Sequence, residues 1–130
     1  MTYAKTPQAT TLTAAMIVNE WAEESIADII FGWGEEHYSR RIAKRIVESR
    51  AKAPIRTSMQ LAEIIRASVP PAYRHGRLHP ATRTFQAIRM ATNDELAALS
   101  EALSKAFETL APEGRIAVIS FHSLEDRIVK

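Results

Sequence analysis

Apolar side chains recur at helical spacing along most of this chain, and this periodicity constrains its fold more than any other feature. The clearest case lies between Leu96 and Leu110, where large apolar residues return every three or four positions. Such spacing places them on one face of an amphipathic helix. The sequence therefore predicts a mainly α-helical chain. Further helices, separated by proline and glycine residues, are expected at 12–21, 23–33, 35–50, 57–69 and from Pro80 onward.

Local signals predict how some of these helices begin and what separates them. Thr11 or Thr13 can cap the first helix, and Thr57 followed by Gln60 forms a capping-box pattern. Two prolines should stop the helix that follows Thr57, and we expect a flexible basic loop over residues 72–79. A kink is expected near residue 93, before the last long helix.

The character of the sequence changes after the turn at residues 112–114. The run from Arg115 to Ser120 is short, apolar and rich in β-branched residues, which favours a buried parallel strand. A parallel strand needs neighbours that this chain does not contain. We therefore expect an irregular lead-in over 1–11, a basic helical domain over 12–92, and an incomplete α/β core over 93–130.

Charge is segregated along the chain. Twelve of the 17 basic residues lie between Arg40 and Met90, with only Glu48 and Glu63 to oppose them, so this stretch carries about +10 at neutral pH. Ten of the twelve are arginine, whose planar guanidinium suits phosphate and base edges. The alternative is a solvated basic face without a ligand. We predict a surface that binds RNA, built from Arg40, Arg41, Lys44, Arg45, Tyr73, Arg74, Arg77, Arg83 and Arg89.

The composition excludes several classes of chemistry. Cysteine is absent, which removes disulfides, thiolate catalysis and zinc–cysteine sites and suits a cytoplasmic location. The histidines lie at spacings that do not predict a metal site. None of the four glycines belongs to a phosphate-binding loop motif. We expect neither a membrane-spanning helix nor a secretory signal in this sequence.

Two motifs could carry chemistry. His122, with Glu125 and Asp126 close by, follows the expected strand at the edge where open α/β sheets place functional residues. Alternatively, Ser123 caps the next helix, with Asp126 as the third residue of a capping box. The second motif runs from His79 to Gln86 and places Thr82, Arg83 and Gln86 near a helix start, where phosphate oxygens bind well.

These motifs resemble those of a known family. The strings HPATRTFQAIR (79–89), NDEL (93–96), LAPEGR (110–115) and SFHSLEDR (120–127) occur here in that order. Together with GEE (34–36) and SRRIA (39–43), they closely resemble the bacterial small-subunit ribosomal RNA cytosine-N(4) methyltransferases (RsmH, also called MraW). The resemblance extends from about residue 12 to the end of the chain.

The resemblance implies an S-adenosylmethionine-dependent class I methyltransferase that modifies the exocyclic amine of a cytosine in 16S ribosomal RNA. It also implies that 12–92 is a helical insertion that recognises substrate, followed by part of a Rossmann-like core. The family's cofactor loop has no counterpart here, so we expect no cofactor binding and no activity from this chain alone, and its catalytic residues are unknown. The missing N-terminal half would be a partner. Motif residues without an assigned role are His79, Thr82, Gln86, His122, Glu125, Asp126 and Arg127.

Two hypotheses from other classes compete with an enzyme fragment. The first is a free-standing RNA-binding module without catalysis. The second is an interaction fragment whose basic face has lost its partner. Several phosphate contacts would make RNA affinity fall steeply with rising salt, whereas lost function predicts weak binding that depends little on salt.

Overall fold

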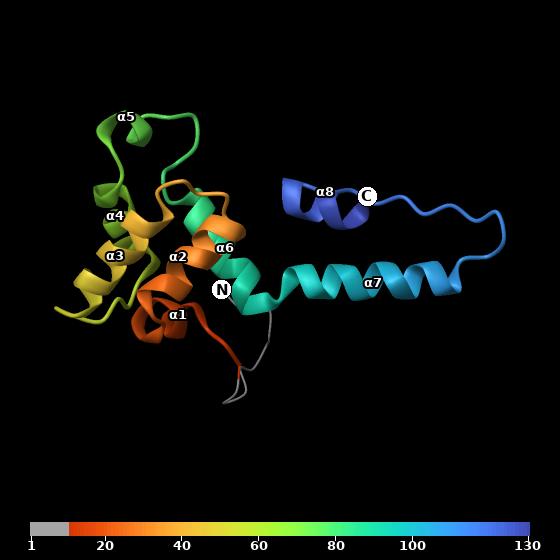
Figure 1. Cartoon of the computed structure of the whole chain (residues 1–130), viewed down its shortest axis with the longest axis horizontal. Helices are drawn as coiled ribbons and strands as arrows, with labels where there is room; N and C mark the ends of the chain where they lie inside the picture. Colours follow the sequence, from red (N-terminus) through yellow and green to blue (C-terminus); the bar gives the residue numbers. More distant parts are fainter. Residues whose placement is uncertain (1–10) are drawn as a thin grey trace. The chain divides into compact units, whose positions relative to one another are not determined.

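The computed structural model describes residues 11–130 and confirms a mainly helical chain (Figure 1). The expected lead-in at 1–11 lies, except for its last residue, outside the described range. Within that range there are eight helices and no strand. The helices are α1 (Ala14–Glu20), α2 (Glu23–Gly32), α3 (Ser39–Arg50), α4 (Ser58–Ser68), α5 (Pro71–Arg74), α6 (Thr82–Asn93), α7 (Glu95–Thr109) and α8 (Ser123–Val129).

The chain forms two compact units. The first ends at Asn93 and the second comprises Asp94–Lys130. Asp94 separates α6 from α7 because it takes a left-handed conformation, with φ 50° and ψ 42°, which no helix can continue. The expected kink at residue 93 is thus a break one residue later.

The first unit is built around isoleucine side chains supplied by successive helices. α2 packs against α3 and α6, and α3 also packs against α4. Long apolar side chains that are fully buried at these contacts make the hydrophobic core, which needs no contribution from the second unit. The fully buried isoleucines are Ile17, Ile26, Ile30, Ile42, Ile46, Ile65 and Ile88.

Two predicted helix starts are confirmed. Thr13 is the N-cap of α1, and its hydroxyl accepts from the backbone N–H of Met16 at 3.2 Å. Thr57 and Gln60 form a complete capping box at α4. Each side chain accepts a hydrogen bond from the other's backbone N–H, at 3.2 and 3.1 Å. Both starts depend on side chains within three residues of each other, which is why the sequence reveals them.

The third helix begins four residues later than predicted, at Ser39 rather than at residue 35. Residues 33–38 form a turn in which Glu35 is left-handed, with φ 49°. Gly34 lies in this turn against the start of α6. A Cβ atom at Gly34 would lie 2.6 Å from the carbonyl oxygen of Ile30 and 2.7 Å from that of Arg83. The turn therefore requires glycine at this position. The absence of a Cβ atom lets the turn lie close to the backbone of both α2 and α6.

The expected flexible loop at 72–79 is partly wrong. Pro71 starts the short helix α5 rather than simply ending α4, since proline is well tolerated in a first helical turn. Tyr73 therefore lies in a helix and not in a loop. The irregular part runs from residue 75 to residue 81, and α6 starts at Thr82, two residues after Pro80.

In the second unit α7 packs against α8. The strand predicted from Arg115 to Ser120 does not form, because the described part of the chain offers no other strand with which it could pair. Its apolar side chains are exposed instead: Ile119 is 82% accessible, and Phe121, directly after the segment, is 91% accessible. The apolar stripe of α7 is also only partly covered, with Phe107 63% accessible.

Between residues 11 and 130, no helix combines the length and the apolar character that crossing a membrane requires.

Candidate nucleic-acid interface

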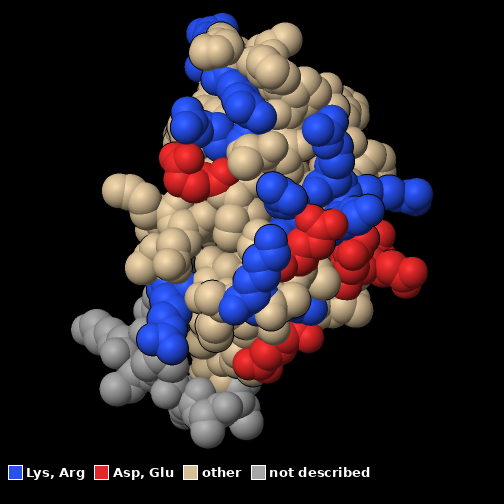
Figure 2. Space-filling view, turned by 90° about the vertical axis from the view of Figure 1, so that its left-hand side faces the viewer, with Lys and Arg blue, Asp and Glu red and all other residues tan. Residues whose placement is uncertain are grey.

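Helix α3 holds four cations away from the core. Ile42, Ala43 and Ile46 are fully buried and fix which side of the helix faces inward. The cations that alternate with them, Arg40, Arg41, Lys44 and Arg45, are all exposed. Figure 2 looks onto the side of the molecule that carries α3 and α4, and there basic groups outnumber acidic ones. The helical periodicity that builds the core thus also directs the charge to solvent.

Three of these cations share a shallow groove with the end of α4. Arg41, Lys44 and Arg45 line it together with Glu48, and Ala67 and Ser68 supply the α4 side of a volume of about 200 Å³. The side chains of Arg41 and Lys44 make no hydrogen bond or ion pair with any residue that the structure describes. We call these six residues the α3–α4 groove.

Among the residues that the structure describes, Arg45 is the one groove cation with a hydrogen-bond or ion-pair partner. Its Nη1 donates to Oε2 of Glu48 at 3.2 Å, one helical turn away. Both side chains are about half exposed, at 54% and 46%. Exposed pairs of this kind contribute only about 0.2–1 kcal/mol, so Arg45 can exchange Glu48 for another anion at little cost.

Other arginines of the basic stretch hold the fold together. Arg50 donates to the carbonyl oxygens of Val18 at 3.0 Å and Trp21 at 2.6 Å, and so satisfies the end of α1. Arg74 donates to the carbonyls of Val69 and Ala67 at 3.1 and 3.3 Å, and so satisfies carbonyl oxygens at the end of α4. Sequence alone could not separate these structural arginines from the ones directed to solvent.

Arg83 and Arg89 also have partners within the chain. Arg83 donates to the carbonyl oxygen of Glu35 at 2.6 Å, which ties α6 to the turn before α3. Arg89 is half-buried in α6 and engaged as well. Arg77, by contrast, is exposed in the irregular segment 75–81. Of the predicted RNA-binding arginines, those on α3 and Arg77 therefore combine exposure with no hydrogen bond to a carbonyl oxygen among the described residues.

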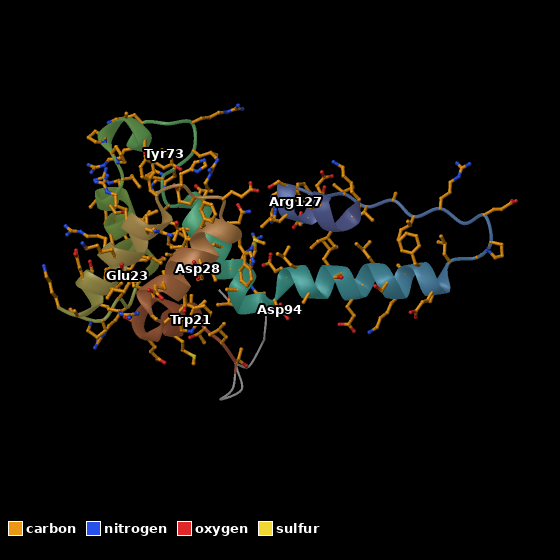
Figure 3. All side chains as sticks on the ribbon, in the orientation of Figure 1. Trp21, Glu23, Asp28, Tyr73, Asp94 and Arg127 are labelled. Atoms are coloured by element: carbon orange, nitrogen blue, oxygen red, sulfur yellow. The ribbon has the colours of Figure 1, made fainter. Side chains whose placement is uncertain are left out.

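Tyr73 has a structural environment that the sequence does not indicate. Its hydroxyl donates to Oε2 of Glu36 at 2.5 Å, and its ring meets that of Tyr38 edge-on at 5.0 Å. Figure 3 shows it directed from α5 toward the other helices of the first unit. Burial, followed by the hydrogen bond to Glu36 and the charge of Glu36, raises the pKa of Tyr73 to about 12, although Arg83 opposes the shift. Its role as a base-stacking residue remains a prediction.

Glu36 is the residue that sequence reasoning missed. Its side chain is completely buried, which is unusual for glutamate. Oε1 accepts from the backbone N–H of Tyr38 at 2.9 Å, and Oε2 accepts from Tyr73. The string GEE at 34–36 contributes to the family resemblance, but nothing local in it distinguishes the buried Glu36 from the exposed Glu35.

The motif at 79–86 is only loosely assembled. Nδ1 of His79 accepts from the backbone N–H of Ala81 at 3.2 Å, which orders the turn before α6. Thr82 is exposed and Gln86 half-buried. No hydrogen bond or ion pair joins these three described side chains, so the structure assigns them no common chemistry.

The motif at 122–127 caps α8, but not as predicted. His122, rather than Ser123, is the N-cap, and its Nδ1 accepts from the backbone N–H of Leu124 at 3.1 Å. Glu125, not Asp126, is the third residue of α8, and its side chain accepts from the backbone N–H of Phe121, the residue before the cap, at 2.9 Å.

The other polar groups of this motif interact locally. Asp126 pairs with Lys130 at 2.6 Å, and Arg127 donates weakly to the carbonyl of Ser123 at 3.4 Å. Nε2 of His122 is buried without a hydrogen bond and lies 3.8 Å from Oε1 of Glu125. From residue 11 onward, no group of three or more histidine, aspartate or glutamate side chains could hold a metal ion.

Comparisons with known proteins agree with the sequence motifs. A family model described as the MraW methylase family matches residues 5–130. Ribosomal RNA small subunit methyltransferase H of Nostoc punctiforme is 60% identical over 119 residues, which cover 92% of this chain and 39% of the relative. Proteins of the same name from Treponema denticola and Brevibacillus brevis are 57% and 58% identical over 119 residues, which cover 38% of each.

The chain therefore spans about two fifths of the length of the curated relatives it matches. The family model, however, extends over nearly all of the chain, including the helical unit and both motif regions. On this evidence, the chain belongs to the MraW methylase family.

Proposed function

We propose that this chain is the rRNA-facing helical region, with part of the catalytic core, of an S-adenosylmethionine-dependent methyltransferase that modifies the exocyclic N4 amine of a cytosine in 16S rRNA. The observation that carries the proposal is the row of accessible cations on α3, in a chain whose relatives are named as small-subunit rRNA methyltransferases. Sequence-independent phosphate contacts supply much of the affinity in complexes with nucleic acid. The proposed partner is 16S rRNA in the small ribosomal subunit, in the cytoplasm.

The residues of the proposed interface fall into two groups. Arg40, Arg41, Lys44 and Arg45 contact phosphates directly, with Arg77 as a further contact from the segment 75–81. The remaining predicted residues, Tyr73, Arg74, Arg83 and Arg89, shape this surface through their contacts within the first unit. Like charges one helical turn apart cost a few tenths of a kcal/mol per pair, so the stability of α3 does not explain its cations, whereas a polyanionic ligand does.

Residues 94–130 serve, in this proposal, as part of a larger α/β core. The apolar side chains of Ile119, Phe121 and Phe107 are exposed in this unit, and burying each would contribute roughly 1.5–3 kcal/mol. A β-sheet supplied by the N-terminal half of the methyltransferase would pair with 115–120 and cover these side chains. That half is thus the second proposed partner.

The described residues do not fit the cofactor. Class I methyltransferases bind it with a glycine-rich loop after a strand, and none of the four glycines in this sequence belongs to such a motif. We expect this chain alone to bind no S-adenosylmethionine and to transfer no methyl group. A calorimetric titration that shows micromolar binding of S-adenosylmethionine to the chain would contradict this.

A chimera tests the enzymatic proposal. In the Nostoc punctiforme relative, the matching segment is replaced by this chain, and transfer of a labelled methyl group to small ribosomal subunits is measured, followed by identification of the modified nucleoside. We expect N4-methylated cytosine at a rate within about tenfold of the unmodified relative. A folded chimera that binds the subunit but transfers no methyl group would favour a non-catalytic RNA-binding module instead.

Charge reversal tests the RNA-facing surface. Changing Arg40, Arg41, Lys44 and Arg45 to glutamate should weaken binding to a labelled 16S rRNA fragment by at least tenfold and reduce its salt dependence. All four are exposed, so helical circular dichroism should be preserved. Unchanged affinity with preserved helicity would show that this face does not meet RNA.

A further inference from the structure

The α3–α4 groove differs from the rest of the basic surface in both shape and composition. Its volume of about 200 Å³ lies below the roughly 300–1,000 Å³ of pockets that enclose small molecules. It is still several times the volume that one water molecule occupies in liquid water, about 30 Å³. The groove therefore has room for a phosphate group and its nearest waters, but not for a whole nucleotide.

The residues that line the groove favour phosphate over bases. It contains three cations and no aromatic ring on which a base could stack. Ala67 and Ser68 form its other side, and the Ser68 hydroxyl already donates to the carbonyl oxygen of Ile65 at 2.6 Å. Small residues there let a sugar–phosphate backbone approach the cations closely. Contacts of this kind position a nucleic acid without reading its sequence.

The end of α4 would by itself oppose an anion. Carbonyl oxygens at a helix C-terminus carry partial negative charge, and Ala67 and Ser68 are among the last residues of α4. Arg74 offsets this negative charge, since its guanidinium donates to the carbonyls of Ala67 and Val69. This contact gives Arg74 a positioning role at the groove.

Glu48 is the feature of the groove that competes with a bound anion. It is the only acidic side chain lining the groove, and it holds Arg45 at 3.2 Å. With three cations and one carboxylate, the groove keeps a formal charge of about +2. An incoming phosphate must draw Arg45 away from Glu48, so the pair keeps Arg45 in position and lowers the affinity at the same time.

We infer that the α3–α4 groove holds one backbone phosphate of the RNA, bound by Arg41, Lys44 and Arg45, and that Glu48 is an internal competitor that limits this affinity. The inference rests on the proposed function, which assigns RNA to the basic face, and it adds a defined subsite to that face.

Removing the competitor is the first test. Binding of a fluorescein-labelled, 20-nucleotide single-stranded RNA of mixed sequence to the full chain is measured by fluorescence anisotropy. Glu48→Gln should tighten binding about two- to fivefold, as expected from releasing an exposed ion pair. The matched control is Glu63→Gln, which removes the same charge from an equivalent pair, Glu63 with Arg66 at 3.3 Å, outside the groove. Equal effects of the two variants would overturn the inference.

Neutralising the groove is the second test. Arg41→Gln with Lys44→Gln removes two groove cations, and Lys52→Gln with Arg56→Gln removes one lysine and one arginine that are exposed elsewhere. The groove variant should weaken binding at least fivefold more than its control and lower the salt slope by about 0.7, the value for one phosphate on a single strand. Equal weakening would overturn the groove but leave an RNA-binding face. No weakening in either variant would refute the proposed function itself.

Discussion

The hydrogen bond between Tyr73 and the buried carboxylate of Glu36 provides a sharp test of how the first unit is held together. Glu36 is fully buried and is contacted by two donors, the backbone N–H of Tyr38 and the hydroxyl of Tyr73. Tyr73→Phe keeps the ring and its edge-on contact with Tyr38 but removes one donor. A hydrogen bond to a charged group contributes about 1.5–3 kcal/mol, and we expect a loss of that size in the free energy of unfolding.

The assay is urea unfolding followed by tryptophan fluorescence. Trp21 and Trp33 are the only two tryptophans and both belong to the first unit, so the signal reports that unit alone. Tyr38→Phe is the matched control. Its hydroxyl makes no hydrogen bond to a described residue, and its removal should change stability by no more than about 0.5 kcal/mol. If Tyr73→Phe costs no more than Tyr38→Phe, the carboxylate does not depend on this donor and the reasoning fails.

Three further changes probe the same unit by urea unfolding. Gly34→Ala should destabilise it by about 1–3 kcal/mol, because the new Cβ would meet two carbonyl oxygens at 2.6 and 2.7 Å; Gly32→Ala, with nothing within 4 Å, should be neutral or slightly stabilising, and the reverse order would contradict the close approach. Thr57→Ala should cost about 1 kcal/mol through loss of the capping box, and an unchanged midpoint would show that the cap contributes nothing. The stability advantage of the wild type over Tyr73→Phe should be complete below pH 10 and shrink between pH 10 and about 12, because the raised pKa of Tyr73 favours the neutral phenol in the folded state; an advantage that stays constant through pH 12 would refute this.

The sequence predicts the parts of this fold that depend on neighbours along the chain. The capping box at Thr57 and Gln60 needs only a few consecutive residues, and the buried face of α3 follows from the spacing of Ile42 and Ile46. Glu36 could not be predicted, because its environment depends on Tyr73, 37 residues away. At the late start of α3, the Glu36 side chain accepts from the N–H of Tyr38, the residue before the helix.

In the candidate site, too, the sequence predicts features that depend on neighbouring residues but not those that depend on other helices or on backbone geometry. Periodicity correctly places Arg41 and Lys44 on the exposed side of α3, but it cannot reveal that α4 adds a second wall. At α8, two adjacent residues could both serve as caps, and only the backbone geometry shows that His122 takes the position. The strand expected at 115–120 depends on pairing with another strand, and such a contact is not encoded in the segment itself.

The arginines that bind carbonyl oxygens within the chain reduce the number of cations that can neutralise RNA phosphates. Arg50 directs its hydrogen bonds to the end of α1, so it is not available to neutralise an RNA phosphate and release counterions. A plot of log affinity against log salt counts only the phosphates that are newly neutralised. The slope of this plot should therefore fall well short of the value that all twelve central cations would produce. Substitution of an arginine by lysine should be tolerated in the groove. At Arg50 it should not be tolerated, because two carbonyl oxygens require the guanidinium fork.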